Sequence, residues 1–161
     1  TVRAENGYIQ WYIDAAHTVH DDLRGHTGGM MTLGKGAIFA KTTKQKLNTR
    51  SSTESEIVGV DDLMPDILWT NHFLKEQGFK VKGTIFYQDN TSTMAWINNG
   101  RHSVGKRAKH INVRFFFIND RVKKGELIIK HCPTDDMIAD YLTKPLQGSK
   151  FIKFRQAIMG E

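Results

Sequence analysis

The chain is poor in the residues that crosslink or interrupt a fold. Its 161 residues include one cysteine, Cys132, and three prolines. A single cysteine excludes an internal disulfide and any zinc site built from several cysteines, and it favours a reducing compartment. The scarcity of proline and the lack of any Ser/Gly/Gln-rich tract argue against disorder or a long linker. Long apolar runs are missing too, since Phe115–Ile118 is far too short to cross a bilayer.

The N-terminal residues do not have the charged-then-apolar pattern of a secretory signal, so we expect an intracellular protein that is neither secreted nor in contact with a membrane. With 39% hydrophobic and 25% charged residues, the chain suits one domain, over 1–161, with a sizeable core. It begins with Thr1 rather than methionine, which leads us to expect a piece excised from a longer protein.

Positive charge is concentrated in one stretch. Residues 101–124 hold eight basic residues and a single acid, Asp120, so this stretch carries more than the whole net charge of +6. A basic cluster of this kind predicts a polyanionic partner, and we expect nucleic acid. The alternative is a solvated face that serves solubility.

The hydrophobic pattern predicts a mixed α/β domain. Strands are expected at Tyr8–Asp14, Met30–Leu33, Ala37–Thr42, Thr84–Gln88 and Glu126–His131. Helices are expected from about Ser51 to Gly78, with a kink or break at Pro65, and at Ser92–Asn98, Ala108–Lys124, Thr134–Thr143 and Ser149–Met159. Three leading strands favour an antiparallel meander, and the two strands entered through helices favour parallel pairing. We therefore predict a mixed five-stranded sheet with helices packed on it.

Four acids occupy informative places in this pattern. Asp14 ends the first strand, Glu54 lies in the first turn of the long helix, Asp89 follows the fourth strand, and Asp140 lies in the helix after the fifth. If the first and fourth strands are neighbours, these carboxylates converge, and a divalent cation is needed to offset their repulsion. Oxygen ligands favour magnesium or manganese, and two such ions about 4 Å apart are a known device for phosphodiester cleavage.

Each acid also has a purely structural interpretation. Glu54 follows Ser51 by three residues and would serve as the acid of a helix capping box. Asp89 would be a turn residue, and Asp140 an exposed helix acid. Spacing alone does not decide between the two interpretations.

Five sequence blocks together resemble a known family. They are YIDAA at 12–16, KQKLNTRSSTESEIVGV at 44–60, YQDNTST at 87–93, KRAKHINVRFFFINDRVKKGEL at 106–127 and HCPTDDMIADYLTKPLQG at 131–148. In these blocks the chain resembles the ribonuclease H domain of copia-type retrotransposon polyproteins. The resemblance implies the RNase H-like fold. It also implies two-metal cleavage of the RNA strand of RNA–DNA hybrids, leaving 5′-phosphate ends, during reverse transcription and beside a reverse transcriptase domain in the same polyprotein.

The resemblance also assigns roles to individual residues. It implies that Asp14, Glu54, Asp89 and Asp140 hold two Mg²⁺ or Mn²⁺ ions, and it places His131 where such enzymes carry a mobile histidine. Residues expected to contact the nucleic acid are Lys106, Arg107, Lys109, His110, Arg114, Asn90 and Ser52. For His110, a buried structural role is an equal alternative. The expected location is a cytoplasmic particle or the nucleus.

One departure keeps a second hypothesis open. Family members often carry a second acid two residues after the first aspartate, where this chain has Ala16. The rival hypothesis is therefore a catalytically inactive or domesticated module that binds nucleic acid or protein. The presence of all four expected carboxylates favours the enzyme.

Overall fold

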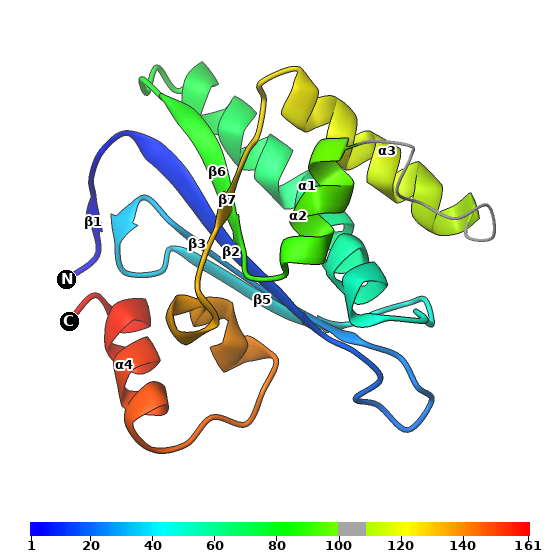
Figure 1. Cartoon of the computed structure of the whole chain (residues 1–161). Coiled ribbons are helices and arrows are strands. Elements are labelled where there is room, and N and C mark those ends of the chain that lie inside the picture. Colours follow the sequence, from blue (N-terminus) through cyan, green and yellow to red (C-terminus); the bar gives the residue numbers. More distant parts are fainter. Residues whose placement is uncertain (100–108) are drawn as a thin grey trace.

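A five-stranded mixed sheet forms the centre of the computed structural model, which describes residues 1–99 and 109–161 (Figure 1). Its strands run in the order β5-β3-β2-β6-β7. Their bounds are β2 Tyr8–Ala16, β3 His26–Thr32, β5 Phe39–Lys44, β6 Gly83–Gln88 and β7 Ile128–His131. The pairs β2/β3 and β3/β5 are antiparallel, whereas β2/β6 and β6/β7 are parallel. The predicted meander, the parallel pairs and the fold class are thus confirmed. A small separate pairing joins β1 (Arg3–Ala4) to β4 (Gly34–Lys35).

Helices cover both faces of this sheet. In Figure 1, α1, α2 and α3 lie together on one side, and α4 lies on the other side with two short 3₁₀ helices. Their bounds are α1 Ser52–Glu76, α2 Thr91–Asn99, α3 Lys109–Lys123, η2 Thr134–Asp136, η3 Ile138–Leu142 and α4 Gly148–Met159. No helix within the described ranges is long and apolar enough to span a bilayer.

The long helix α1 begins at a capped end and buries one stripe. The Ser51 side chain accepts a hydrogen bond from the Glu54 backbone N–H at 3.2 Å, which satisfies one of the free donors of the first turn. Its buried residues Ile57, Leu63 and Ile67 pack into the main core with residues of β2 and β6. We expected Pro65 to kink or break the helix, but α1 continues through it as one element. Pro65 is exposed, so water can satisfy the Asp61 carbonyl that it leaves unpaired, and burial on both sides of it holds the helix together.

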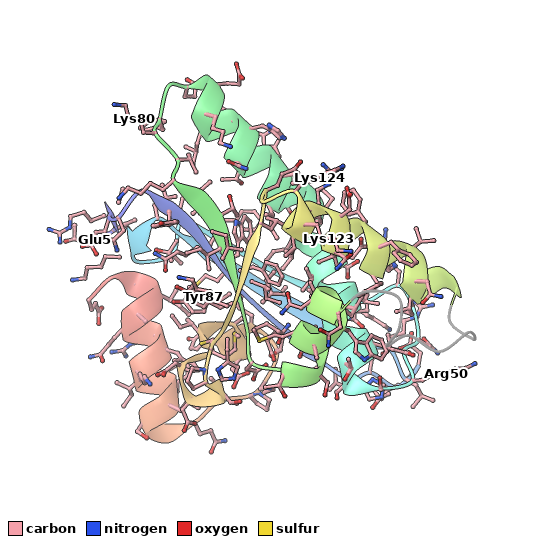
Figure 2. All side chains as sticks on the ribbon, turned by 45° about the horizontal axis from the view of Figure 1, so that its top comes forward. Glu5, Arg50, Lys80, Tyr87, Lys123 and Lys124 are labelled. Carbon is pink, nitrogen blue, oxygen red and sulfur yellow. The ribbon has the colours of Figure 1, made fainter. Side chains whose placement is uncertain are left out.

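A second, smaller core lies on the opposite face. Cys132, Met137 and Ala139 are buried there, beside the stacked rings of Tyr12 and Tyr87, whose centroids are 4.7 Å apart. Figure 2 shows Tyr87 on the side of the sheet toward α4. Burial raises the pKa of the Tyr12 hydroxyl to about 12, and the neighbouring Tyr87 adds to this.

The segment 134–143 was expected to form one α-helix, and that prediction is wrong. The structure has the two 3₁₀ turns η2 and η3 instead. Within this segment, Met137, Ala139 and Asp140 are buried, a spacing of two and then one that does not fit the 3.6-residue period of an α-helix. Burial of these particular side chains against the sheet overrides the helical propensity of the segment.

Two adjacent glycines of β3 let α1 on one face of the sheet and the segment after η3 on the other pack close to the strand. A β-carbon on Gly29 would overlap Cδ1 of Leu63 in α1, and one on Gly28 would lie 2.7 Å from Cγ2 of Thr143, just after η3. Successive residues of a strand face opposite sides. The pair therefore removes side-chain bulk from both faces of β3, next to Asp14, which pairs with Gly28.

We expect Gly29→Ala to destabilise the protein by about 1–3 kcal/mol, because the new methyl group overlaps the fully buried Leu63. Denaturant unfolding of Gly29→Ala, Leu63→Ala and the double variant measures the effect. The double variant should be more stable than the sum of the two single losses predicts, since Leu63→Ala makes room for the methyl group. Strict additivity would show that the contact does not limit the packing of α1.

Candidate active site

The ends of two parallel neighbours bring two aspartates together. Asp14 lies near the end of β2 and is 2% exposed, and Asp89 directly follows β6. Because β2 and β6 run parallel side by side, their carboxyl ends meet at one edge of the sheet. Asp14 and Asp89 were expected to meet there, and the structure brings them together. With Glu56 of α1 they form a cluster in which one carboxylate oxygen from each residue lies within 4.8 Å of the others.

Glu56 is held in this cluster by two donors from neighbouring strands. Its Oε1 accepts a hydrogen bond from the Ala15 backbone N–H at 3.2 Å, and its Oε2 accepts one from Nε2 of Gln88 at 3.1 Å. The Gln88 side chain is itself fixed, because its Oε1 accepts the Asn90 backbone N–H at 3.0 Å. Glu56 is 4% exposed, so α1 delivers a buried acid whose position is set by the sheet.

Glu54 was expected to be the helix acid of the site, and the structure places it elsewhere. Its Oε2 accepts the Arg50 backbone N–H at 2.8 Å, while its own N–H donates to Ser51. These contacts are those of an N-terminal capping acid. Two residues along a helix correspond to a rotation of about 200°, so Glu54 and Glu56 face nearly opposite directions. Glu56 takes the place expected for Glu54.

Asp140 reaches the site from the other face of the sheet. It lies in η3 and is 1% exposed. Its Oδ1 pairs with Nζ of Lys144 at 2.6 Å, and its Oδ2 pairs with Nζ of Lys150 at 2.8 Å. The same Lys144 ammonium lies 3.5 Å from Oδ1 of Asp14, and the Thr143 hydroxyl donates a hydrogen bond to Oδ2 of Asp14. Asp140 is therefore joined to Asp14 through Thr143 and Lys144.

Burial and like charge both oppose ionisation here. Burial raises the pKa of Glu56 well above its usual range, and the charges of Asp14 and Asp89 add to the effect. Burial likewise raises the pKa of Asp14, although the Thr143 hydrogen bond and the Lys144 charge partly offset it. Burial lowers the pKa of Lys144, but its hydrogen bond to Asp140 and the charge of Asp14 outweigh that and leave it raised. The site thus holds more negative charge than its own residues neutralise.

This donor set fits a divalent metal ion. Asp14, Glu56 and Asp89 offer only carboxylate oxygens, the ligands that Mg²⁺ and Mn²⁺ prefer, and they lie close enough to share one ion. A second ion would lie between Asp14 and Asp140, where the Lys144 ammonium is found. Asp14 would then belong to both positions.

Three further expected residues lie around the carboxylates. His131 is exposed at the end of β7 and is in register with Gln88, the residue before Asp89. Asn90 uses its Oδ1 to accept the Thr93 backbone N–H at the start of α2, so that oxygen serves as a helix cap. Ser52 is exposed in the first turn of α1.

The basic stretch is partly neutralised by neighbouring acids. Arg114 pairs with Asp61 of α1, Arg121 with Glu126 at 3.0 Å, and Lys124 with Asp120 at 2.8 Å. Arg114 was expected to contact nucleic acid, but the structure engages it with α1. The expected Lys106 and Arg107 lie outside the described residues, and so do the side chains of Lys109 and His110.

Within the same stretch, the residues at the end of α3 are remote from the carboxylates. Figure 2 shows Lys123 and Lys124 at the end of α3, from which the chain enters β7. Because β7 runs parallel to β6, this entry point is at the opposite end of the sheet from Asp89.

Known sequences similar to this chain are found among retrotransposon Pol polyproteins. It is 35% identical over 140 residues to the retrovirus-related Pol polyprotein from transposon RE1 of Arabidopsis thaliana, a match that covers 86% of this chain. It is 30% identical over 131 residues to the Pol polyprotein from transposon TNT 1-94 of Nicotiana tabacum, covering 81% of this chain. The chain is thus similar to one segment of the Pol polyproteins of plant retrotransposons. It spans only 9% and 10% of the length of these two relatives. No protein-family model matches it.

Solved structures agree on the fold. LC11-RNase H1, isolated from compost by a metagenomic approach, superposes with a TM-score of 0.62 at 13% identity, covering 85% of this chain and 93% of that one. The prototype foamy virus protease–reverse transcriptase superposes with a TM-score of 0.54 at 14% identity, covering 93% of this chain and 20% of that one. The RNase H fold of this Pol-related domain is thus shared by a chain of similar size and by part of a much longer one.

The two glutamates of α1 allow a matched test. Glu56→Gln removes a charge from a buried anionic cluster, so the gain in melting temperature on adding Mg²⁺ should disappear. Glu54→Gln should keep both the metal-free stability and the Mg²⁺ gain, because glutamine also serves in a capping box. Thermal unfolding of both variants with EDTA and with Mg²⁺ makes the comparison. A normal Mg²⁺ response in Glu56→Gln would remove Glu56 from the site.

Proposed function

We propose that this domain is a metal-dependent ribonuclease H that hydrolyses the RNA strand of RNA–DNA hybrids during reverse transcription of a retrotransposon. The observation that carries the proposal is the convergence of Asp14, Glu56 and Asp89 at one edge of an RNase H-fold sheet, with Asp140 beside them. Two comparisons support the choice of substrate and partner. LC11-RNase H1 was also solved in complex with an RNA/DNA hybrid, and the foamy virus chain joins this fold to a reverse transcriptase.

In this proposal the four carboxylates hold two magnesium or manganese ions. When bound, the ions would supply activated water and charge stabilisation at the leaving oxygen. The protein contributes an arrangement of ligands held in place by hydrogen bonds. Ala15 and Gln88 fix both oxygens of Glu56, and Thr143 fixes Asp14. Ligands held in this way do not need to reorganise when charge develops at the phosphate.

His131 is the residue we assign to proton transfer or product release. It is exposed at the end of β7, in register with the residue before Asp89, so it can reach the edge of the site without being locked into it. Selection of the RNA strand would come from contacts to 2′-hydroxyl groups, which DNA lacks. Leaving 5′-phosphate ends and acting beside a reverse transcriptase domain of the same polyprotein are parts of the same proposal.

The direct test is cleavage of a labelled RNA–DNA hybrid by the purified domain with Mg²⁺, with EDTA as the control and a DNA duplex as the specificity control. Asp89→Asn keeps the shape of the side chain but removes a charge that holds cations, so cleavage should fall by orders of magnitude. Its melting temperature should hold or rise, because carboxylate repulsion is relieved. Hybrid binding without any cleavage by the unaltered domain would favour the rival, an inactive binding module.

A second prediction concerns His131. Because this side chain is exposed, His131→Ala should leave the melting temperature unchanged, while turnover should fall by roughly 10²-fold if it transfers a proton. Single-turnover and steady-state rates on the hybrid separate the two roles. A loss confined to the steady-state rate would assign His131 to product release, and unchanged rates in both would exclude it from the reaction.

A further inference from the structure

The four acids of the site are not equally neutralised by nearby cations. Both oxygens of Asp140 face ammonium groups, from Lys144 at 2.6 Å and Lys150 at 2.8 Å. Glu56, in contrast, receives its hydrogen bonds from the neutral Ala15 N–H and Gln88 amide, and Asp89 receives one from the Thr134 hydroxyl at 3.1 Å. Among the residues that the structure describes, no lysine or arginine forms an ion pair with Glu56 or Asp89. The Asp140 side of the site therefore carries its own cations, and the Glu56 side does not.

Lys144 lies between the two acids that a second metal ion would share. Its Nζ is 2.6 Å from Oδ1 of Asp140 and 3.5 Å from Oδ1 of Asp14. Mg²⁺ binds carboxylate oxygens at about 2.0–2.1 Å, so an ion bridging the same two oxygens would need the space that the ammonium takes. Two cations in contact also repel each other strongly. Lys144 and a second ion therefore compete for one position.

The lysine can leave this position without unfolding anything. Its side chain as a whole is 41% exposed, so solvent lies next to it. The flexible four-carbon stem of a lysine can swing its head group into solvent. Asp14 and Asp140 are each 2% exposed or less and stay in place. Exchange of the ammonium for a metal ion thus requires only a side-chain rotation.

We propose that Lys144 is a built-in counter-cation of this site, which a second divalent ion must displace from between Asp14 and Asp140. This inference rests on the proposed two-ion function and deepens it. The cluster of Asp14, Glu56 and Asp89 binds the first ion, because Lys144 pairs only with its Asp14 member and, among the described residues, no lysine or arginine pairs with Glu56 or Asp89. The second ion binds more weakly and after the first. Displacing Lys144 costs free energy, and either a high metal concentration or a bound phosphate offsets that cost. Both ions are therefore bound only under one of these two conditions.

Ion binding, rather than cleavage, is the decisive measurement. Isothermal titration with Mn²⁺ should give one tight and one weak site in the unaltered domain, and Asp140→Asn should lose the weak one. Lys144→Met removes the competing charge at similar length, so it should tighten the second site by roughly tenfold or more. Lys144→Arg keeps the charge and should leave the second site weak. Lys153→Met is a matched control, because Lys153 pairs with the exposed Asp136 at 2.6 Å and should not affect either site.

A thermal measurement guards against a variant that merely folds poorly. Without metal, Lys144→Met should melt lower than the unaltered domain, because Asp14 and Asp140 lose a shared counter-charge, and saturating Mn²⁺ should raise its melting temperature by more. The inference is overturned if Lys144→Met leaves the second affinity unchanged, or if Lys144→Arg tightens it equally. Cleavage of the hybrid by the unaltered domain is scored separately. Cleavage with an unchanged Lys144→Met isotherm refutes only the inference, and a tightened second site without cleavage refutes only the proposed function.

Discussion

Repulsion between buried carboxylates is the constraint around which this domain is arranged. Asp14, Glu56 and Asp140 are almost fully buried, where each negative charge is costly unless it is matched. The fold holds these acids on three separate elements: β2, α1 and η3. Each acid receives hydrogen bonds or ion pairs from its surroundings, so none can move away to relieve the repulsion. A site fixed in this way remains strongly attractive to cations.

The glycine pair in β3 lets these elements approach one another. Gly29 admits Leu63 of α1 on one face of the sheet, and Gly28 admits Thr143 on the other. Thr143 also donates a hydrogen bond to Asp14. The close approach of Thr143 to Gly28 therefore helps to set the distance between Asp140 and Asp14. Because Gly28 pairs with Asp14 itself, the place where α1 and the segment after η3 come closest to β3 lies next to the carboxylates. The geometry of the site is thus a consequence of packing in a strand that contributes no ligand.

Much of this arrangement could be predicted from the sequence, because strand order follows from how strands are connected. Three strands joined directly, and two entered through helices, led to the correct sheet and to the meeting of Asp14 with Asp89. We expected Glu54 to be the helix acid because it lies in the first turn of the helix, whereas the structure brings the second glutamate of SSTESE, Glu56, to the site. A usable signal was present: Glu56 is in phase with the buried Val60, Leu63 and Ile67, so it is an acid on an apolar stripe. The contact of Lys144 with Asp14 could not be foreseen, because it depends on how the segment after β7 packs against β2.

The lone cysteine has a practical consequence. Cys132 lies directly after β7, where its N–H donates to the Gln88 carbonyl at 3.0 Å, and burial raises the pKa of its thiol to about 11, with nearby acids contributing. A thiol that is both covered and protonated reacts with alkylating reagents only when its surroundings open. Since the chain has no other thiol, its rate of modification reports the opening of this edge alone, between His131 and the η2 turn that contacts Asp89. The alkylation rate of Cys132 therefore measures how often the edge of the sheet next to the carboxylate site opens locally.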